Sequence, residues 1–186
     1  VGANPYINSP GSSCATTNTL ASSLIALSNG KILYTHAAAS PNNKTVLISA
    51  MGYNTTADCL TTQAAPATTA LPTAALVHSS GQLLIAYGST TNASNSIYAY
   101  DLDISTNVIS NATAAYSDFS TVMGPSAIAE DTATGNVFVA NAISTYNNVE
   151  KFSYSSSTKT LTHAAGLSFI GTSAFTRCVS AMAVMY

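Results

Sequence analysis

The 186-residue chain has little charge, no tryptophan and no long apolar run. Only 6% of its residues are charged, whereas about 25% is ordinary for a globular protein. The formal net charge is −2 and the five Lys and Arg residues are scattered, so no basic surface is available to bind the phosphates of nucleic acid. No apolar run reaches the roughly 18 residues of a membrane-spanning helix. The sequence therefore predicts neither a nucleic-acid partner nor a membrane span.

Hydroxyl and amide side chains take the place of the missing charges. Serine and threonine make up about a quarter of the chain, far above ordinary usage. Sequons of the form Asn-x-Ser/Thr lie at Asn43, Asn54, Asn92 and Asn111. A chain rich in Asn and Thr forms single sequons by chance, but four of them, few charges and a first residue, Val1, that is not methionine favour a secreted glycoprotein. We expect an extracellular location and glycans at some of these asparagines.

Two apolar strands joined by a turn that contains glycine occur three times in the sequence. The segments are "LASSLIALSNGKILYTH" from Leu20, "LPTAALVHSSGQLLIAYG" from Leu71 and "GPSAIAEDTATGNVFVAN" from Gly124. Their turn glycines are Gly30, Gly81 and Gly135. Glycine suits a tight hairpin turn because it accepts a positive φ. The spacing of about 50 residues predicts a repeated supersecondary unit.

Two more strands are expected after each of these pairs. A third strand begins near Thr45, Ser96 and Asn148, and a short fourth strand begins near Cys59, Val108 and Thr160. Alternation of apolar and polar residues, with many β-branched and aromatic side chains, supports strands throughout. Four antiparallel strands per repeat are typical of a β-propeller blade. An antiparallel sandwich whose strands only look periodic is the alternative.

The repeat resembles that of a known family. The segments "GPSAIAEDTATGNVFVAN…NNVEKFSYSSSTKTLT" and "HSSGQLLIAYG…NSIYAYDLDISTNVIS" are similar to the blades of lactonase-like, YVTN-type β-propellers, and the resemblance covers residues 20 to about 168. It implies an all-β, β-propeller-like repeat domain over residues 20–186, with three complete blades and an incomplete fourth, preceded by an N-terminal extension over residues 1–19. Such folds carry lactonases, isomerases, binding modules and scaffolds, so the resemblance alone does not give the function.

The fourth repeat consists only of "CVSAMAVMY", residues 178–186, which align with the innermost strand of the other blades. An isolated innermost strand leaves an open edge that must be paired. Residues 1–19 could return to close a four-bladed ring or reach a neighbouring copy, and otherwise the chain is a fragment of a larger propeller. We expect residues 1–19 to pair with Val179–Tyr186 of a neighbouring copy, because 19 residues with two prolines cannot supply three strands.

Three cysteines, Cys14, Cys59 and Cys178, predict one disulfide and one free thiol in an oxidising compartment. Cys14 and Cys178 both lie just before an expected innermost strand, which places them on the same face of a propeller. Cys59 leads an outermost strand, which starts at the opposite face. We expect a Cys14–Cys178 disulfide, within one chain or between copies; the alternative is Cys14–Cys59 with Cys178 free.

Few residues offer catalytic or metal-binding chemistry. The resemblance implies that an active lactonase would place a calcium site of Glu, Asn and Asp, or a His/Arg/Glu group, at the central channel. Glu130 and Asp131 could form a carboxylate pair there, although a solvated turn before "TATG" is the interpretation we favour. Asp101 and Asp103 could likewise bind calcium, but turn formation fits their position better.

The histidines and tyrosines are expected to have structural roles. His36, His78 and His163 occupy different points of their repeats and share no metal-ligand spacing, so we expect polar strand or loop residues. Tyr98, Tyr100 and Tyr154 lie on third strands, where packing between blades is favoured over a carbohydrate-binding row. In the third blade we expect a core from Ile128, Val137, Val139, Val149, Phe152 and Leu161, with Phe138 on the opposite face.

These observations together favour a non-enzymatic structural protein. We expect a secreted, glycosylated subunit without a cofactor that forms a homo-polymer, an extracellular fibre or surface layer, by sharing strands between copies. The alternatives are a secreted β-propeller module that binds a glycan or a protein, and a lactonase-like enzyme fragment whose catalytic groups lie partly in other blades.

Overall fold

The computed structural model describes residues 20–28, 31–37, 44–49, 71–88, 96–106, 108–117, 124–143 and 146–164. Over these ranges the chain is all-β and contains no helix, and hence none that could cross a membrane. The first three strands are β1 (Leu20–Ala26), β2 (Lys31–Ala37) and β3 (Lys44–Ser49). The next four are β4 (Leu71–Val77), β5 (Gln82–Gly88), β6 (Ser96–Asp103) and β7 (Val108–Tyr116). The last four are β8 (Pro125–Asp131), β9 (Asn136–Ile143), β10 (Tyr146–Ser155) and β11 (Thr160–His163).

The strands form three separate antiparallel sheets, each in simple chain order. The first sheet is β1-β2-β3, the second is β4-β5-β6-β7 and the third is β8-β9-β10-β11. The predicted repeat of four-stranded antiparallel sheets is thus confirmed for the second and third units. The expected strand from Cys59 and the segment 178–186 lie outside the described residues. Within those residues the three sheets do not close into a ring.

Glycine makes the first turn of each complete sheet. Gly81 has a φ of 86° and Gly135 a φ of 69°, both in the left-handed region that side chains disfavour. The N–H of Gly81 donates to the carbonyl of His78 at 2.8 Å, and the N–H of Gly135 donates to the carbonyl of Asp131 at 2.7 Å. The predicted hairpin glycines are therefore confirmed at both turns.

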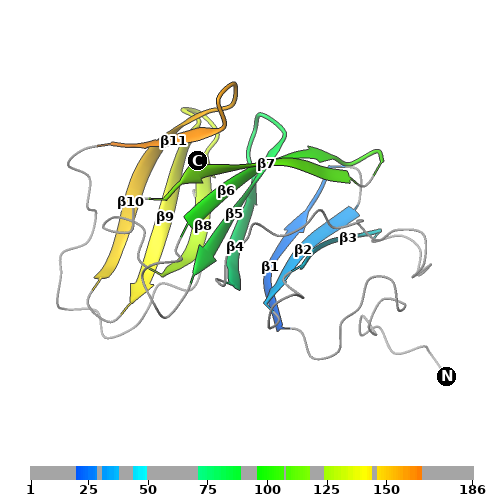
Figure 1. The fold of residues 1–186 in the computed structure, drawn as a ribbon, viewed down its shortest axis with the longest axis horizontal. Coiled ribbons are helices and arrows are strands. Elements are labelled where there is room, and N and C mark those ends of the chain that lie inside the picture. Colours follow the sequence, from blue (N-terminus) through cyan, green and yellow to red (C-terminus); the bar gives the residue numbers. More distant parts are fainter. Residues whose placement is uncertain are drawn as a thin grey trace.

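The second sheet lies between the other two and is buried on both faces (Figure 1). Along β5, Leu83, Ile85 and Tyr87 pack toward the first sheet, in a cluster that includes Leu33 of β2. Alternate residues of the same strand pack toward the third sheet. This two-sided burial explains why β5 reads as an almost unbroken apolar run although its side chains alternate between faces.

The core between the second and third sheets contains most of the residues expected for it. Its buried members are Ala74, Leu84, Ala86, Ile97, Ala99, Ala115, Ile128, Val137, Val139, Phe152 and Leu161. Val149 is not among them, so that expectation is wrong. Val149 is an odd number of residues from Phe152 on the same strand and faces the other way. Phe138 alternates away from this core as predicted, and it is only partly buried.

The first strand of every sheet contains a β-bulge at the same place. The pairing register shifts between Ala21 and Ser23, between Pro72 and Ala74, and between Pro125 and Ala127. The residues at these bulges are Ser22, Thr73 and Ser126, all with hydroxyl side chains.

Two of these hydroxyls make the same contact. The hydroxyl of Thr73 donates to the carbonyl of Ala86 at 3.2 Å, and that of Ser126 donates to the carbonyl of Ala140, also at 3.2 Å. Each bond runs from the bulge to the neighbouring strand, where the bulge has disrupted the ladder. Counting from the bulge therefore identifies equivalent positions in the three sheets.

Candidate functional site

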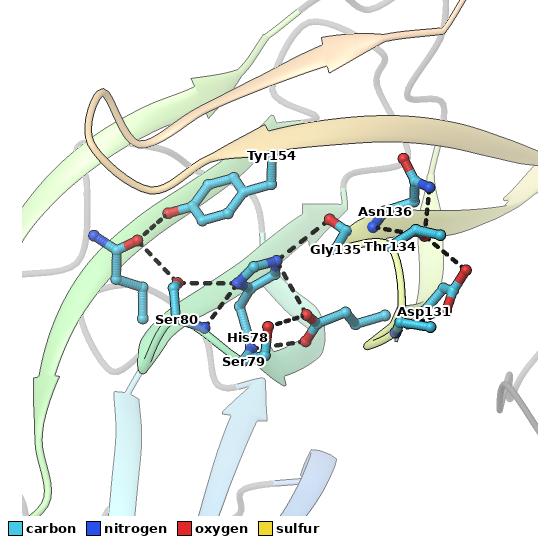
Figure 2. Close-up of polar contacts among 11 residues, drawn as sticks. His78, Ser79, Ser80, Asp131, Thr134, Gly135, Asn136 and Tyr154 are labelled. Atoms are coloured by element: carbon cyan, nitrogen blue, oxygen red, sulfur yellow. Dashed lines mark hydrogen bonds and ion pairs between the residues drawn. The ribbon is translucent and has the colours of Figure 1, made fainter. Parts of the chain in front are cut away.

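Polar side chains gather where the turns of the second and third sheets meet, and we call this group the inter-sheet cluster (Figure 2). It comprises His78, Ser79, Ser80, Gln82 and Asp101 of the second sheet and Glu130, Tyr154 and Lys159 of the third. The β4–β5 turn supplies the first three residues, and the end of β8 and the β10–β11 hairpin supply the residues opposite. The cluster closes one end of the apolar core between these sheets.

His78 is the centre of the cluster and is 7% exposed. The backbone N–H of Ser80 donates to Nδ1 at 3.1 Å, which makes Nδ1 the unprotonated nitrogen. The proton is therefore on Nε2, which lies 3.2 Å from Oε1 of Glu130 and 3.4 Å from the carbonyl of Gly135. The ring also packs edge-on against Tyr154, with centroids 4.7 Å apart. The β4–β5 turn is thus fastened to the third sheet through one imidazole.

Glu130 is held from two sides. Besides His78, its Oε2 accepts the backbone N–H of Ser79 at 2.8 Å, and its Oε1 accepts the hydroxyl of Ser79 at 2.5 Å. The residue is 8% exposed and lies on β8, so the expectation of a solvated turn is wrong for Glu130. It is right for Asp131, whose carboxylate accepts the N–H of Ala133 and the hydroxyl of Thr134 within the turn. Because adjacent residues of a strand point to opposite faces, Glu130 is directed toward the second sheet and Asp131 toward its own turn.

Gln82 links the same turn to the β10–β11 hairpin. Its Oε1 accepts the hydroxyl of Tyr154 at 2.8 Å, and its Nε2 donates to the carbonyl of Ser156 at 3.1 Å. Burial raises the pKa of Tyr154 to about 12, with a further contribution from the negative charge of Asp101. Tyr154 therefore stays a hydroxyl donor at neutral pH, and the predicted packing role of this tyrosine is confirmed by its place against the core.

Lys159 forms the outer part of the cluster. Its Nζ lies 2.7 Å from Oδ2 of Asp101 and 3.1 Å from the carbonyl of Asn111. The amide Nδ2 of Asn111 donates to the same Asp101 oxygen at 2.7 Å. The hydrogen bonds from Lys159 and Asn111 lower the pKa of Asp101. Asp101 is thus an ion-pair residue, whereas Asp103 forms the predicted turn, accepting the N–H groups of Ser105 and Thr106 at 2.8 and 3.2 Å.

The lowered pKa of Asp101 gives an expected pH dependence. A lowered pKa means that the folded state prefers the carboxylate, so its stabilisation is complete well above pH 4 and is lost as the pH falls through the acid range. We expect Asp101→Asn to lower the free energy of unfolding by about 0.5–1 kcal/mol at pH 7, since the ion pair is partly exposed. Urea unfolding at pH 7 and at pH 3 measures this difference.

The difference between the two proteins should shrink at pH 3. Ser157→Ala is the control, because it alters an exposed residue of the hairpin that carries Lys159 without removing a charge, and it should show no such pH dependence. A difference for Asp101→Asn that is equally large at pH 3 and pH 7 would contradict the charge-based explanation.

A second polar row crosses the third sheet at the end where Pro125 pairs with Asn141. Nδ2 of Asn141 donates to Oδ1 of Asn148 at 2.8 Å, and Nδ2 of Asn148 donates to Oε1 of Glu150 at 2.5 Å. The other carboxylate oxygen of Glu150 lies 2.7 Å from Nε2 of His163. Asn141 and Glu150 are buried. His78 and His163 are thus each paired with a glutamate, which their positions in the repeat did not reveal.

The buried tyrosines lie on the other face of the second sheet. The hydroxyls of Tyr87 and Tyr100 are 2.8 Å apart, and Tyr98 packs edge-on against Tyr87 with centroids 5.7 Å apart. Burial raises the pKa of Tyr87 to about 12 and raises that of Tyr100 further, with the neighbouring Tyr87 adding to the effect. These side chains fill the interface with the first sheet, as predicted for Tyr98 and Tyr100.

Ser80, His78 and Glu130 form a chain of hydroxyl, imidazole and carboxylate, the groups that activate a serine nucleophile in hydrolases. The hydroxyl of Ser80 is 2.9 Å from Nδ1 of His78. That nitrogen already accepts the backbone N–H of the same serine, and Glu130 is shared with Ser79. These contacts attach the β4–β5 turn to the third sheet. The arrangement is best suited to locking two sheets together.

At the positions equivalent to His78 and Glu130, the first and second sheets contact each other through apolar side chains. Counting from the bulge, Leu27 corresponds to His78 and Val77 corresponds to Glu130. Leu27 and Val77 both pack against the apolar cluster between the first and second sheets. An apolar pair of positions at one interface is thus replaced by a hydrogen-bonded polar pair at the next.

Several predicted sites fall outside the described residues: Cys14, Cys59, Cys178, Asn43, Asn54 and Asn92. Asn111 is described; it lies on β7 with a φ of 52° and an exposed side chain. His36 lies on β2. No group of three metal-ligating side chains is present in the part of the chain that the structure describes.

Comparison with protein-family models, with curated proteins and with solved structures finds no significant match for this chain. The function therefore has to be argued from the stacking of the sheets and from the contacts between them.

Proposed function

We propose that the chain is a non-enzymatic structural subunit of an extracellular fibre or surface layer. The observation that carries this proposal is the stacking of the repeats, in which the second sheet is buried on both faces by its neighbours. In a repeat protein each unit depends on the unit beside it, so the terminal units need a further partner. A second copy of the chain is the simplest partner of matching shape.

The same stacking supports a propeller-like arrangement. The first strands of consecutive sheets are neighbours, β1 beside β4 and β4 beside β8, and the outermost strands β7 and β11 also meet. Blades of a propeller have this order, with first strands inside and fourth strands outside. We propose that the described sheets are three such blades and that residues 178–186 begin a fourth.

Strand sharing is the assembly mode that we propose. A strand formed by Val179–Tyr186 needs partners for its backbone N–H and C=O groups, and residues 1–19, which precede the first repeat in the sequence, are the segment that we propose as its partner. One donated strand needs only about 5–6 residues. Donation to the next copy would join subunits end to end, and a disulfide between Cys14 and Cys178 would then fasten that junction.

Glycans form part of the proposal, and the surroundings of Asn111 support one there. This asparagine lies on β7, the edge strand of the second sheet, with its side chain exposed. Its Nδ2 donates one hydrogen to Asp101, which leaves the second hydrogen of the amide free to be replaced by a sugar. A glycan at this edge would also hinder unwanted pairing with other strands.

Removing residues 1–12 tests the assembly mode. We expect the full chain to form long polymers and the shortened chain to give soluble single subunits, because the donated strand is missing. Light scattering and electron microscopy of both proteins measure this. Intact mass before and after enzymatic deglycosylation, on protein from a secreting host, tests the glycan part.

The control is Ser157→Ala, which alters only an exposed hairpin residue and should leave assembly unchanged. Polymers that form equally well without residues 1–12 would rule out strand donation, as would a full-length chain that remains monomeric at high concentration.

A further inference from the structure

One face of the third sheet is directed away from the second sheet. Its residues resemble those on the face of the second sheet that packs against the third sheet. On the second sheet, the corresponding positions are Ala74, Leu76, Leu84, Ala86, Ile97 and Ala99, which pack against the third sheet. Counting from the bulges and along the paired strands, the equivalent residues of the third sheet are Ala127, Ala129, Phe138, Ala140, Val149 and Lys151. Five of these six positions are apolar.

This face is well protected from solvent at its centre. Ala127 is 6% exposed, Ala129 is 7% exposed and Ala140 is fully buried. The second sheet cannot be the cover, because it lies against the opposite face, with Ile128, Val137 and Phe152. This face therefore has the apolar composition and the low exposure of a surface that packs against a neighbour.

The last residues of the chain align with the first strands of the three sheets, position by position. The bulge hydroxyls Ser22, Thr73 and Ser126 recur at Ser180, and each is followed by a small residue, Ser23, Ala74, Ala127 and Ala181 respectively. Counted from Ser180, Met182 takes the position of Ile128 and Val184 takes that of Glu130. Both equivalents face the preceding sheet in the structure. The two apolar side chains would therefore face the third sheet.

We propose that Val179–Tyr186 packs in its own chain on this face of the third sheet, with Met182 and Val184 against Ala127, Ala129 and Phe138. The connection is long enough, since residues 164–178 join β11 to this segment whereas only residues 117–124 join β7 to β8. Ser180 would repeat the bulge contact of Thr73 and Ser126 by donating to a carbonyl. This packing does not depend on polymer formation, because strand sharing uses the edge of the segment and the proposed contact uses its face.

Methionine oxidation tests the packing directly, because the reaction follows exposure of the sulfur. The segment contains Met182, which should face the third sheet, and Met185, which takes the position of His78 and should face away. In the full chain treated with hydrogen peroxide, we expect Met182 to react about tenfold more slowly than Met185. Peptide mass spectrometry measures both rates in one sample.

A variant of the receiving face makes the test specific. Ala129→Arg should bring the rate at Met182 close to that at Met185, whereas Ala114→Arg, on an exposed position of β7, should leave Met182 protected. Equal rates at Met182 and Met185 in the unaltered chain would overturn the proposal without any variant. Protection that disappears on dilution would also overturn it, since the segment would then come from another copy.

Discussion

Replacing His78 with leucine is expected to lower the free energy of unfolding by about 3 kcal/mol, because it leaves a buried carboxylate without its imidazole partner. Glu130 is 8% exposed and would keep only its hydrogen bonds from Ser79. Leucine has a suitable size and shape for the site, since Leu27 occupies the equivalent position of the first sheet. Urea unfolding at neutral pH, followed by circular dichroism, measures the loss.

The decisive comparison is the double variant His78→Leu with Glu130→Val, which copies the residues Leu27 and Val77 from the other interface. Replacing a buried polar pair with well-packed apolar residues is often neutral or stabilising, so we expect the double variant to lie within about 1 kcal/mol of the natural chain. A double variant as unstable as the sum of both single changes would contradict the equivalence of the two interfaces. A single variant of unchanged stability would show that the inter-sheet cluster does not hold the sheets together.

Truncating Phe152 to alanine is expected to cost about 3–5 kcal/mol, since its ring is completely buried at the centre of the core between the second and third sheets. The ring packs edge-on against Tyr116 with centroids 4.8 Å apart, so the cavity would border β7 as well as β9 and β10. Thermal and urea unfolding measure the loss.

Phe138→Ala is the matched comparison, because it removes the same side chain from the opposite face of the same sheet. Phe138 is only partly buried, so a smaller loss is expected. Equal losses for the two phenylalanines would contradict the assignment of Phe152, and not Phe138, to this core. Phe152→Leu should fall between the natural chain and Phe152→Ala, since less volume is lost.

The strands and their order could be predicted because their signals are local. Gly81 and Gly135 mark the turns, and alternation of apolar residues marks the strands on either side. The face of a strand on which a side chain lies is also local information, because successive side chains alternate between faces. The error at Val149 came from grouping it with Phe152, which is three positions away on the same strand and therefore on the opposite face. The closure of sheets into a ring depends on contacts between residues far apart in the sequence, which local patterns do not encode.

The inter-sheet cluster could not be predicted in the same way. Ser79 and Glu130 are 51 residues apart and belong to different sheets, so no local spacing joins them. The signal that could have found the contact is the bulge hydroxyl. Aligning the repeats on Ser22, Thr73 and Ser126 places Leu27 and His78 at one position and Val77 and Glu130 at another. A joint change from apolar to polar at two positions that face each other indicates an interface.

The difference between the two interfaces has a consequence for how the chain folds. The first three strands of all three units share one topology, so a wrong partner of similar shape is available during folding, within the chain or on a neighbouring molecule. If the third sheet docked against the first, Glu130 would be buried beside Leu27, and Ser28 could take the part of Ser79 but no imidazole would be present, at a cost of about 3 kcal/mol. Correct docking against His78 carries no such penalty. The polar pair thus specifies the order in which the sheets stack. Interfaces made only of interchangeable apolar residues would allow the sheets to stack in a different order.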